Sequence, residues 1–331
     1  MRLKVCLLMA VVAAIVLSSL FLLHNVSSFA AESQDELSVL LEGCRQAAQA
    51  AQSGKGQVTV YQYHHHAVLE EAGVLETNAT RTVAFSGVRF KLIDEVKTLK
   101  NVPATPPPSG AVLVAPGSVR TEQFAYDGEK ATAYSPAEGR AKIGDANSDV
   151  GTLAADTFVV VKPSLYTLFD LTNYSPVPPG LTREAPRIVG REAVGGDECT
   201  IVEVYDHGVI EGSRSVESWH RFWVNTAKGC AVSRIRSWVR GGIYTEKTLR
   251  TEVNSDLRQY GSGLWGPAKV TGSVYSINQT TREYYKELEQ TVTYAEDFQL
   301  NVPVSDSELT LTLPSGTKVT NELLQETYTV P

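Results

Sequence analysis

The stretch RFWVNTAKGCAVSRIRSW, residues 221–238, has the pattern of a β-hairpin. A run of Phe, Trp and Val enters the segment Asn-Thr-Ala-Lys-Gly at residues 225–229, and apolar residues that alternate with Ser and Arg leave it. Such runs on either side of a short segment containing Asn and Gly are typical of strand, turn and strand. The segment carries no evident catalytic group, so we expect it to form a surface that holds something apolar and not to take part in catalysis.

A five-residue turn predicts the register of this hairpin. Counting outward from the turn, the expected pairs are Val224 with Cys230, Phe222 with Val232 and His220 with Arg234. Successive residues of a strand point to opposite faces. The two apolar sets are then Phe222, Val224, Cys230 and Val232 on one face, and Trp219, Trp223, Ala231 and Ile235 on the other. Because an antiparallel sheet with one wet face is apolar on one side only, we expect each face of the hairpin to contact a core, a helix or a ligand.

Most of the chain beyond the hairpin also has the composition of β-strands. About ten segments, such as QVTVYQYHHH (57–66) and CTIVEVYDHG (199–208), are rich in Val, Thr, Tyr and Phe and often alternate with polar residues. Strands in sequence without intervening helices indicate an antiparallel sheet. We therefore expect a mainly β domain over residues 31–331, with two half-sheets as the alternative arrangement.

One amphipathic helix is expected near the start of this domain. Ser33 and Glu36 have the spacing of a capping box. The apolar residues that follow at helical spacing are Leu37, Leu40, Leu41, Cys44, Ala47, Ala48 and Ala51, and Gly54 is the expected stop. A short helix is expected at residues 165–171, and proline-rich surface loops at 101–110 and 174–180.

Residues 1–30 have the features of an export signal. Arg2 and Lys4 precede an uncharged run from Val5 to Leu23, and small residues lead to an expected cleavage after Ala30. The run of 19 residues is longer than the roughly 7–15 of a signal core and near the roughly 20 that span a bilayer. A cleaved signal predicts a periplasmic or secreted protein, and a retained segment predicts an anchor in the inner membrane at residues 5–23.

The charge of the remaining chain argues against nucleic acid as a partner. Residues 1–30 hold two of the 30 Lys and Arg and none of the 37 Asp and Glu, so the chain without them has 28 basic and 37 acidic groups and a net charge of −9. A surface of this sign repels phosphate backbones and gains nothing from an anionic membrane surface.

Three cysteines follow the export segment: Cys44, Cys199 and Cys230. An exported location permits a disulfide bond. Cys199 and Cys230 lie on segments expected to be nearby strands, which makes them the better pair and leaves Cys44 over. Three separate buried thiols are the alternative, because cysteine is often simply a small core residue.

No pattern of catalytic or metal-binding residues stands out. His64 and His66 share a strand face, but a third metal ligand has no identifiable spacing. The segment GSGLWG (261–266) has G-x-G-x-x-G spacing, but a strand follows it where a dinucleotide site needs a helix. There is no G-x-S-x-G segment, and His207 and His220 have no evident catalytic partner. We expect no metal, no cofactor and no enzyme activity.

Arginines line one side of the second hairpin strand, at Arg234, Arg236 and Arg240, with Trp238 among them. One interpretation is a clamp for the phosphate or carboxylate of a headgroup at the rim of a cavity. The other is cross-strand pairing on a solvated face, with the arginine stems covering the tryptophan. The second interpretation is the preferred one.

Three successive segments carry a further pattern: IVGREAVGGDECTIVEVY (188–205), RFWVNTAKGCAVSRIRSW (221–238) and YTEKTLRTEVNSDLRQYGSGLWGPAKVTGSVY (244–275). They resemble exported proteins of the LolA-like superfamily, particularly its divergent members in planctomycete-type bacteria. In that family a strand leads to W-[VI]-[DN]-x-x-K-G, then to an arginine-bearing strand and a G-x-W-x-P segment. The tail at 297–331, with its P-x-G-T-x-V turn, is similar too. The resemblance spans residues 185–331, and its motifs mark turns and packing.

The resemblance implies a single curved antiparallel sheet that forms a half-open barrel, with an N-terminal amphipathic helix and short helices closing an apolar cavity. Members of the family carry lipoprotein acyl chains or glycolipids across the periplasm, and a related branch senses lipoproteins or envelope stress by binding an anti-sigma factor.

The expected function is therefore the binding of lipid or lipoprotein acyl chains in an apolar cavity, for carriage or sensing. The alternative is an interaction module that binds another envelope or membrane protein without cargo of its own. The candidate ligand-binding residues are Trp219, Phe222, Trp223, Trp238, Arg234 and Arg236.

Overall fold

The computed structural model describes residues 35–47, 49–66, 73–102, 115–159, 180–210, 214–241, 244–261, 263–277 and 284–331. The expected export segment, the short helix expected at 165–171 and nearly all of the two proline-rich loops lie outside these residues. No helix in the described part of the chain is long and apolar enough to cross a membrane.

The first half of the described chain supplies one helix, six strands and a second helix. The N-terminal helix covers residues 35–47 and 49–50. The strands are β1 (Ser53–His66), β2 (Gly73–Ser86), β3 (Arg89–Val102), β4 (Val119–Tyr126), β5 (Lys130–Ser135) and β6 (Arg140–Asp145). Helix α2 (Asp149–Val159) follows them.

The second half continues almost entirely as strands. They are β7 (Leu181–Arg183), β8 (Arg187–Val194), β9 (Asp197–Ile210), β10 (Arg214–Asn225), β11 (Ala231–Gly241), β12 (Tyr244–Gln259), β13 (Trp265–Ile277) and β14 (Tyr284–Tyr294). The C-terminal elements are β15 (Gln299–Leu300), α4 (Asp306–Leu309), β16 (Lys318–Asn321) and β17 (Glu326–Thr329). A single 3₁₀ turn, Thr226–Lys228, joins β10 to β11.

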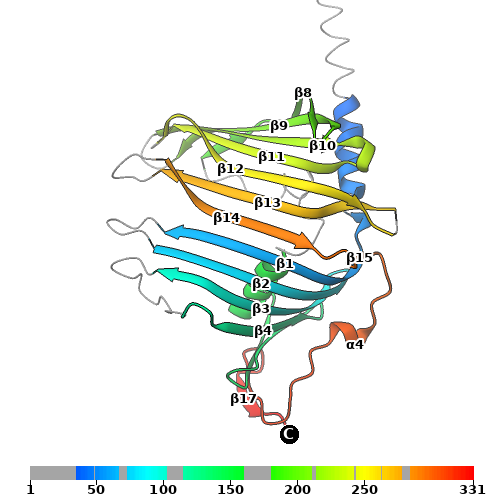
Figure 1. The fold of residues 1–331 in the computed structure, drawn as a ribbon, viewed down its shortest axis with the longest axis vertical. Coiled ribbons are helices and arrows are strands. Elements are labelled where there is room, and N and C mark those ends of the chain that lie inside the picture. Colours follow the sequence, from blue (N-terminus) through cyan, green and yellow to red (C-terminus); the bar gives the residue numbers. More distant parts are fainter. Residues whose placement is uncertain are drawn as a thin grey trace, which may run out of the picture.

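All the described strands belong to one sheet. From one edge to the other the pairings run β8, β9, β10, β11, β12, β13, β14, β1, β2, β3, β4, β5, β6, β16, β17, with β7 also on β9 and β15 also on β1. The pairing of β6 with β16 is parallel and the others are antiparallel. Figure 1 shows this stack, in which the first strand of the chain lies in the middle between β14 and β2.

One face of the sheet, called the inner face below, carries the two main hydrophobic clusters. The larger cluster joins β1, β2 and β3 to β13 and β14, with Val58, Phe85, Leu92, Val270 and Val292 among its members. The smaller cluster lies on β9, β10 and β11. Val253 of β12 packs against both, so the two clusters share a face. Burial of this apolar surface is the main term that stabilises the sheet.

Each cluster has its own helix. Leu40 and Cys44 of the N-terminal helix are buried in the β9–β11 cluster, with Leu37 and Leu41 packed at its margin. Val150 and Ala154 of α2 belong to the larger cluster, and α2 contacts β4, β5 and β6. Figure 1 shows α2 behind the strands and the N-terminal helix, in blue, at one end of the sheet. The apolar spacing of residues 37–44 therefore gave the buried side of the first helix correctly.

The N-terminal helix ends earlier than expected. The sequence predicts a stop at Gly54, but β1 begins at Ser53 and Gly54 is a strand residue. A Cβ on Gly54 would lie 2.7 Å from the Phe85 ring and 2.8 Å from the carbonyl oxygen of Gln299. Glycine is needed there because a ring and a neighbouring backbone approach closely, and not because the residue ends a helix.

The register of the β10–β11 hairpin differs from the expected one. Phe222 pairs with Ile235 and Val224 with Val232, and the register shifts between Trp223 and Val224 because β11 has one extra residue there, a bulge. Gly229 and Cys230 have φ angles of 64° and 60°, so Cys230 belongs to the turn and β11 starts at Ala231. The extra residue in the bulge, Ser233, moves Ile235 to the same face as Phe222.

The fold class expected from the sequence is confirmed: the chain is mainly β, with a single curved, unclosed sheet, an N-terminal amphipathic helix and few other helices. The strands do not separate into two half-sheets, because β1 and β14 pair through seven residues from Val58 to His64. The parallel pair of β6 and β16 was not foreseen; it brings the C-terminal segment to the edge strand, where Val319 packs with Tyr134 and Ala141.

Candidate functional site

A groove on the inner face, called the central groove, lies between the two helix-covered parts of the sheet. It is formed by β12, β13 and β14 and encloses about 100 Å³. Its lining residues are Thr251, Val253, Val270, Gly272, Ser273, Val274, Leu288, Gln290 and Val292. Five of these nine are Val or Leu, so the groove presents mainly hydrocarbon and suits an apolar group.

Gln290 places an amide among these apolar side chains. It sits on β14 opposite Gln62 of β1 and Gly272 of β13. Its Nε2 is buried and has no hydrogen-bond partner in the described part of the chain. A buried donor without an acceptor costs roughly 1–3 kcal/mol. The groove therefore contains one donor that a ligand with a carbonyl or carboxylate oxygen would satisfy.

Gly272 leaves the floor of the groove open. It is an interior strand residue, where glycine is unfavourable without a packing reason. A Cβ added at Gly272 would meet only Val253 Cγ2, at 3.9 Å, within a 4 Å radius. The missing side chain therefore creates empty space instead of relieving a clash, and a larger residue at 272 would fill the groove.

A polar cluster occupies the inner face of β9, β10 and β11, beyond the part covered by the N-terminal helix. His220 Nδ1 lies 2.9 Å from Ser237 Oγ, and His220 Nε2 lies 3.3 Å from Ser218 Oγ. Asp206, which is 2% exposed, accepts two hydrogen bonds from Arg183 at 2.7 and 2.8 Å. The prediction from the sequence that His220 has no partner is wrong, because strand pairing gives it two hydroxyl neighbours and a carboxylate.

The electrostatics of this cluster favour a neutral His220. Burial lowers the pKa of His220 below its usual value, the Asp206 carboxylate opposes that effect, and Arg183 adds to it. Asp206 Oδ2 is 3.7 Å from His220 Nε2, beyond hydrogen-bond distance. Asp206 is therefore aligned with Arg183 and not with the ring, and the contacts of the ring nitrogens are with the hydroxyl groups of Ser218 and Ser237.

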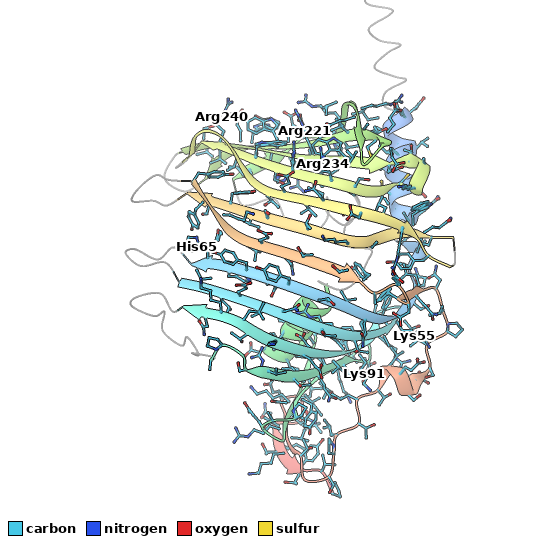
Figure 2. The ribbon with its side chains drawn as sticks, in the orientation of Figure 1. Lys55, His65, Lys91, Arg221, Arg234 and Arg240 are labelled. Atoms are coloured by element: carbon cyan, nitrogen blue, oxygen red, sulfur yellow. The ribbon has the colours of Figure 1, made fainter. Side chains whose placement is uncertain are left out.

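The opposite, outer face of the hairpin carries alternating arginine and tryptophan side chains, called the arginine–tryptophan ladder. Its members are Trp219, Arg221, Trp223, Arg234, Arg236, Trp238 and Arg240. Guanidinium groups lie over indole rings at 5.4–5.8 Å, with Arg234 and Arg236 over Trp223, Arg221 over Trp238 and Arg240 over Trp219. Figure 2 shows Arg221, Arg234 and Arg240 together in this part of the molecule. Such contacts cover the rings with charged stems.

Carboxylates neutralise the ladder. Glu252 accepts from Arg236, Glu217 from Arg240, and Glu192 from both Arg234 and the indole Nε1 of Trp223. The structure thus shows the cross-strand pairing that was the preferred interpretation of these arginines. With their guanidinium groups already paired to protein acids, they do not form an open clamp for an anionic headgroup.

Glu203 is the most buried acid of the outer face. It accepts a hydrogen bond from Arg187 at 2.7 Å and one from Arg221 at 2.7 Å, and it is 3% exposed. Burial opposes its ionisation, but the bonds from the two guanidinium groups outweigh burial and hold the pKa of Glu203 below its usual value. The carboxylate therefore stays ionised and ties β8, β9 and β10 together.

The structure divides the candidate ligand-binding residues between the two faces. Phe222 is buried on the inner face with the N-terminal helix. Trp219, Trp223, Trp238, Arg234 and Arg236 all belong to the ladder on the outer face. Phe222 and Trp223 lie on opposite faces, as the sequence predicts, because the sheet pleat sends successive side chains in opposite directions.

The cysteine pairing also differs from the preferred expectation. No disulfide bond joins the described cysteines. Cys199 is a strand residue opposite Glu192, where the Ser233 side chain hydrogen-bonds to its thiol. Cys230 lies instead in the hairpin turn beside Cys44, whose thiol donates to the Cys230 carbonyl oxygen at 3.6 Å. The left-handed turn at 229–230 directs Cys230 toward the N-terminal helix and away from Cys199.

A second, larger cavity lies between β1, β2 and β3 and the C-terminal segment that carries α4. It encloses about 580 Å³ and is lined by Lys55, Lys91, Asp297 and Glu308 besides smaller residues. Figure 2 shows Lys55 and Lys91 next to this segment. Lys55 pairs with Glu308 at 2.7 Å, and this bond lowers the pKa of Glu308 to about 2. Four charged residues make this cavity a poor place for a hydrocarbon chain.

The structure places two motifs that were noted in the sequence. His64 and His66 lie on β1, and the described residues contain no group of three or more His, Cys, Asp or Glu that could hold a metal ion. Gly261 and Gly263 belong to the turn between β12 and β13, where Tyr260 N donates to Leu264 O at 2.8 Å and Gly263 has a φ of 79°.

Sequence reasoning missed Gly272 and Gln290, the two residues that shape the central groove. The available signal was the alternation Leu288, Gln290, Val292, in which one amide interrupts an apolar strand face. A glycine inside the strand segment AKVTGSVYSI was the other. Neither signal shows that the two residues are neighbours, because their pairing depends on the register of β13 and β14.

Comparisons with known proteins give loose structural similarities. No protein-family model matches the chain, and no curated protein matches it significantly. A DUF1329 family protein from Desulfovibrio piger is 13% identical with a TM-score of 0.38, and covers 82% of this chain and 96% of its own. An outer membrane lipoprotein-sorting protein domain from Vibrio parahaemolyticus is 11% identical with a TM-score of 0.34, and covers 81% of this chain and 95% of its own. LprF from Mycobacterium bovis is 9% identical with a TM-score of 0.27, and covers 80% of this chain and 94% of its own. At these scores nothing about the ligand of this chain follows from the names.

Proposed function

We propose that this chain is a divergent LolA-like, planctomycete-type protein of the cell envelope that binds acyl chains of a lipid or lipoprotein in the central groove. The observation that carries this proposal is the lining of the groove: valine and leucine side chains around one buried, unsatisfied amide donor, Gln290 Nε2. A hydrocarbon chain with an ester, amide or carboxylate end matches both features.

The driving force is the burial of hydrocarbon. Each methylene group moved from water into an apolar site gains about 0.8 kcal/mol. The groove volume of about 100 Å³ accommodates about three water-sized groups. It therefore holds the end of an acyl chain, and the rest of the acyl chain lies along the inner face. Val253, Val274 and Leu288 line the groove and are half-buried, so they offer apolar surface that an acyl chain can contact.

In this proposal Gln290 binds the polar end of the acyl chain. Its Nε2 donates to a carbonyl or carboxylate oxygen, which removes the cost of an unsatisfied donor. No covalent step is involved, and neither a metal nor a cofactor is needed. Transfer or sensing depends on a partner that competes for the same hydrocarbon. The export features of residues 1–30 support a location in the periplasm, outside the cell or at the inner membrane.

The proposal is tested by a substitution that fills the central groove. Gly272→Leu places a branched side chain into open space, and Thr271→Leu adds the same side chain one residue away on the outer face of β13. Binding of a long-chain fluorescent fatty acid is titrated against detergent-free, full-length protein and both variants.

We expect saturable binding by the unmodified protein and by Thr271→Leu, and at least tenfold weaker binding by Gly272→Leu. A tenfold change corresponds to about 1.4 kcal/mol, less than the roughly 2.4 kcal/mol gained by burying three methylene groups. Equal affinities of all three proteins would show that the acyl chain binds outside the central groove. The absence of saturable binding to any of them would refute lipid binding.

A second candidate function rests on the small volume of the groove. Large side chains of the protein itself fill most of the inner face under both helices, as expected of an interaction module without cargo. In that case the arginine–tryptophan ladder, which includes Trp219, Trp238, Arg234 and Arg236, is the surface for an envelope protein. Loss of a co-purifying protein from a Trp238→Ala variant, with lipid binding absent throughout, would favour this function.

A further inference from the structure

Cys44 and Cys230 are 186 positions apart in the chain, yet their side chains meet between the N-terminal helix and the hairpin turn. The Cys44 thiol is 0% exposed and reaches the Cys230 carbonyl oxygen at 3.6 Å. Cys230 packs at the margin of the cluster in which Cys44 is buried. The helix supplies one thiol and the hairpin the other, so a bond between them would connect two elements that are distant in sequence.

Gly43 keeps the space next to the two thiols free. A Cβ on Gly43 would lie 2.7 Å from Cys230 Sγ, closer than real Cβ contacts. Glycine lowers the stability of a helix interior by about 1 kcal/mol relative to alanine. Its presence in this helix is therefore explained by the sulfur atom that occupies the place of its side chain.

The backbone conformation of Cys230 is a second, independent sign that its side chain is held next to Cys44. Its φ of 60° is in the left-handed region, which glycine and asparagine adopt far more readily than cysteine. Gly229 before it has nearly the same conformation without this cost. A residue held in such a conformation is kept for what its side chain does, and here the side chain points at Cys44.

We propose that Cys44 and Cys230 form a disulfide bond that fastens the N-terminal helix to the β10–β11 turn. The two thiols give up two protons and two electrons as the Sγ–Sγ bond forms. A small-molecule disulfide or an oxidised dithiol protein of the export compartment accepts them and becomes two thiols. Cys199, which lies on β9 next to the Ser233 side chain, stays a thiol.

The chemistry of Cys230 suits this reaction. A hydrogen bond from Cys44 lowers the pKa of Cys230 to about 7, so a large fraction is thiolate at neutral pH. The thiolate is the species that attacks a disulfide. By contrast, burial raises the pKa of Cys199, which slows the corresponding reaction there.

The bond would hold the helix over the inner face next to the central groove. Leu40 and Cys44 are the helix residues buried against β9–β11, so the crosslink fixes the apolar contact that the helix already makes. This inference is independent of the ligand, because it concerns the attachment of the helix and not the lining of the groove.

The test is a peptide map of the full-length protein equilibrated with glutathione disulfide. Remaining thiols are alkylated in denaturant, the protein is digested with trypsin, and mass spectrometry identifies the linked peptides. We expect the peptide of residues 229–234 to be joined to the peptide that contains Cys44, and the Cys199 peptide to be alkylated. A link between Cys199 and Cys230, or alkylation of all of them, would overturn the proposal.

Matched variants separate the bond from general effects on folding. Cys199→Ser is expected to form the link, and a reductant is expected to lower its melting temperature as it does for the unmodified protein. Cys44→Ser is expected to form no link, and its melting temperature should not respond to the reductant. Gly43→Ala is expected to form the link at least tenfold more slowly. If Cys44→Ser does not fold, the maps of the unmodified protein and of Cys199→Ser still decide, because a missing link in both refutes the bond.

Discussion

The buried ion pair of Arg81 and Asp94 offers a sharp test of the inner face. Arg81 Nε and Asp94 Oδ1 are 3.0 Å apart, and a second bond joins Nη2 to Oδ2 at 3.3 Å. The residues are paired across β2 and β3, and their side chains are 8% and 9% exposed. We expect Asp94→Asn to destabilise the protein strongly, because it removes the negative charge but leaves the guanidinium buried.

The size of the loss follows from this burial. Removing one partner of a buried pair costs about 3–5 kcal/mol, since solvent cannot replace the lost carboxylate. Replacing both partners, as in Arg81→Met with Asp94→Leu, removes both charges and is expected to be neutral or stabilising. The double variant should therefore unfold at a higher urea concentration than the single variant.

Urea unfolding followed by circular dichroism measures these free energies. The matched control is Glu289→Gln, which breaks the exposed pair of Lys286 and Glu289, with side chains 40% and 42% exposed. An exposed pair contributes about 0–1 kcal/mol, so the control should change little. A loss below about 1 kcal/mol for Asp94→Asn would refute the description of this part of the inner face as water-excluded.

Two further predictions concern other residues of the inner face. Gln290→Leu replaces a buried amide donor without a partner in the described chain by a side chain of similar size, so we expect the free energy of unfolding to rise by about 1 kcal/mol, and a decrease in urea unfolding would contradict this. His220 has a pKa lowered below 6.5, so its neutral form favours the folded state and stability is lost as pH falls below about 6.5. Melting temperatures from pH 7.5 to pH 5 should fall less steeply for His220→Gln, and equal slopes would show that His220 does not titrate in a buried site.

Local patterns in the sequence were sufficient for the type of most elements. The apolar spacing of Leu37, Leu40, Leu41 and Cys44 predicted the helix and its buried side, because a helix repeats every 3.6 residues and needs no information from distant residues. The β-hairpin was also predictable, since the segment Asn-Thr-Ala-Lys-Gly lies between two runs of strand composition.

The register of the hairpin was not predictable from the same pattern. It depends on Cys230 adopting a left-handed conformation and on the extra residue at Ser233, and neither has a distinctive sequence signal. A shift of one residue moves every later side chain to the other face. For this reason Ile235 was assigned to the face opposite Phe222, whereas the two are a cross-strand pair on the inner face.

The candidate site was harder still, because strand pairing assembles it from distant positions. Asp206, His220 and Ser237 are adjacent only because β9, β10 and β11 pair in sequence. Cys44 meets Cys230 only because the helix folds back onto the sheet. Contacts of this kind depend on the final topology, so composition and spacing indicate the residue types but not the neighbours.

The most direct test of acyl-chain binding is native mass spectrometry of the protein as its host processes it, isolated from the bacterial envelope without detergent. An organic extract of the same sample identifies any lipid. We expect a stoichiometric mass increase that matches an acyl lipid in the extract, and a loss of that increase in Gly272→Leu but not in Thr271→Leu. An unliganded mass that stays unchanged after incubation with lipid vesicles would contradict lipid binding.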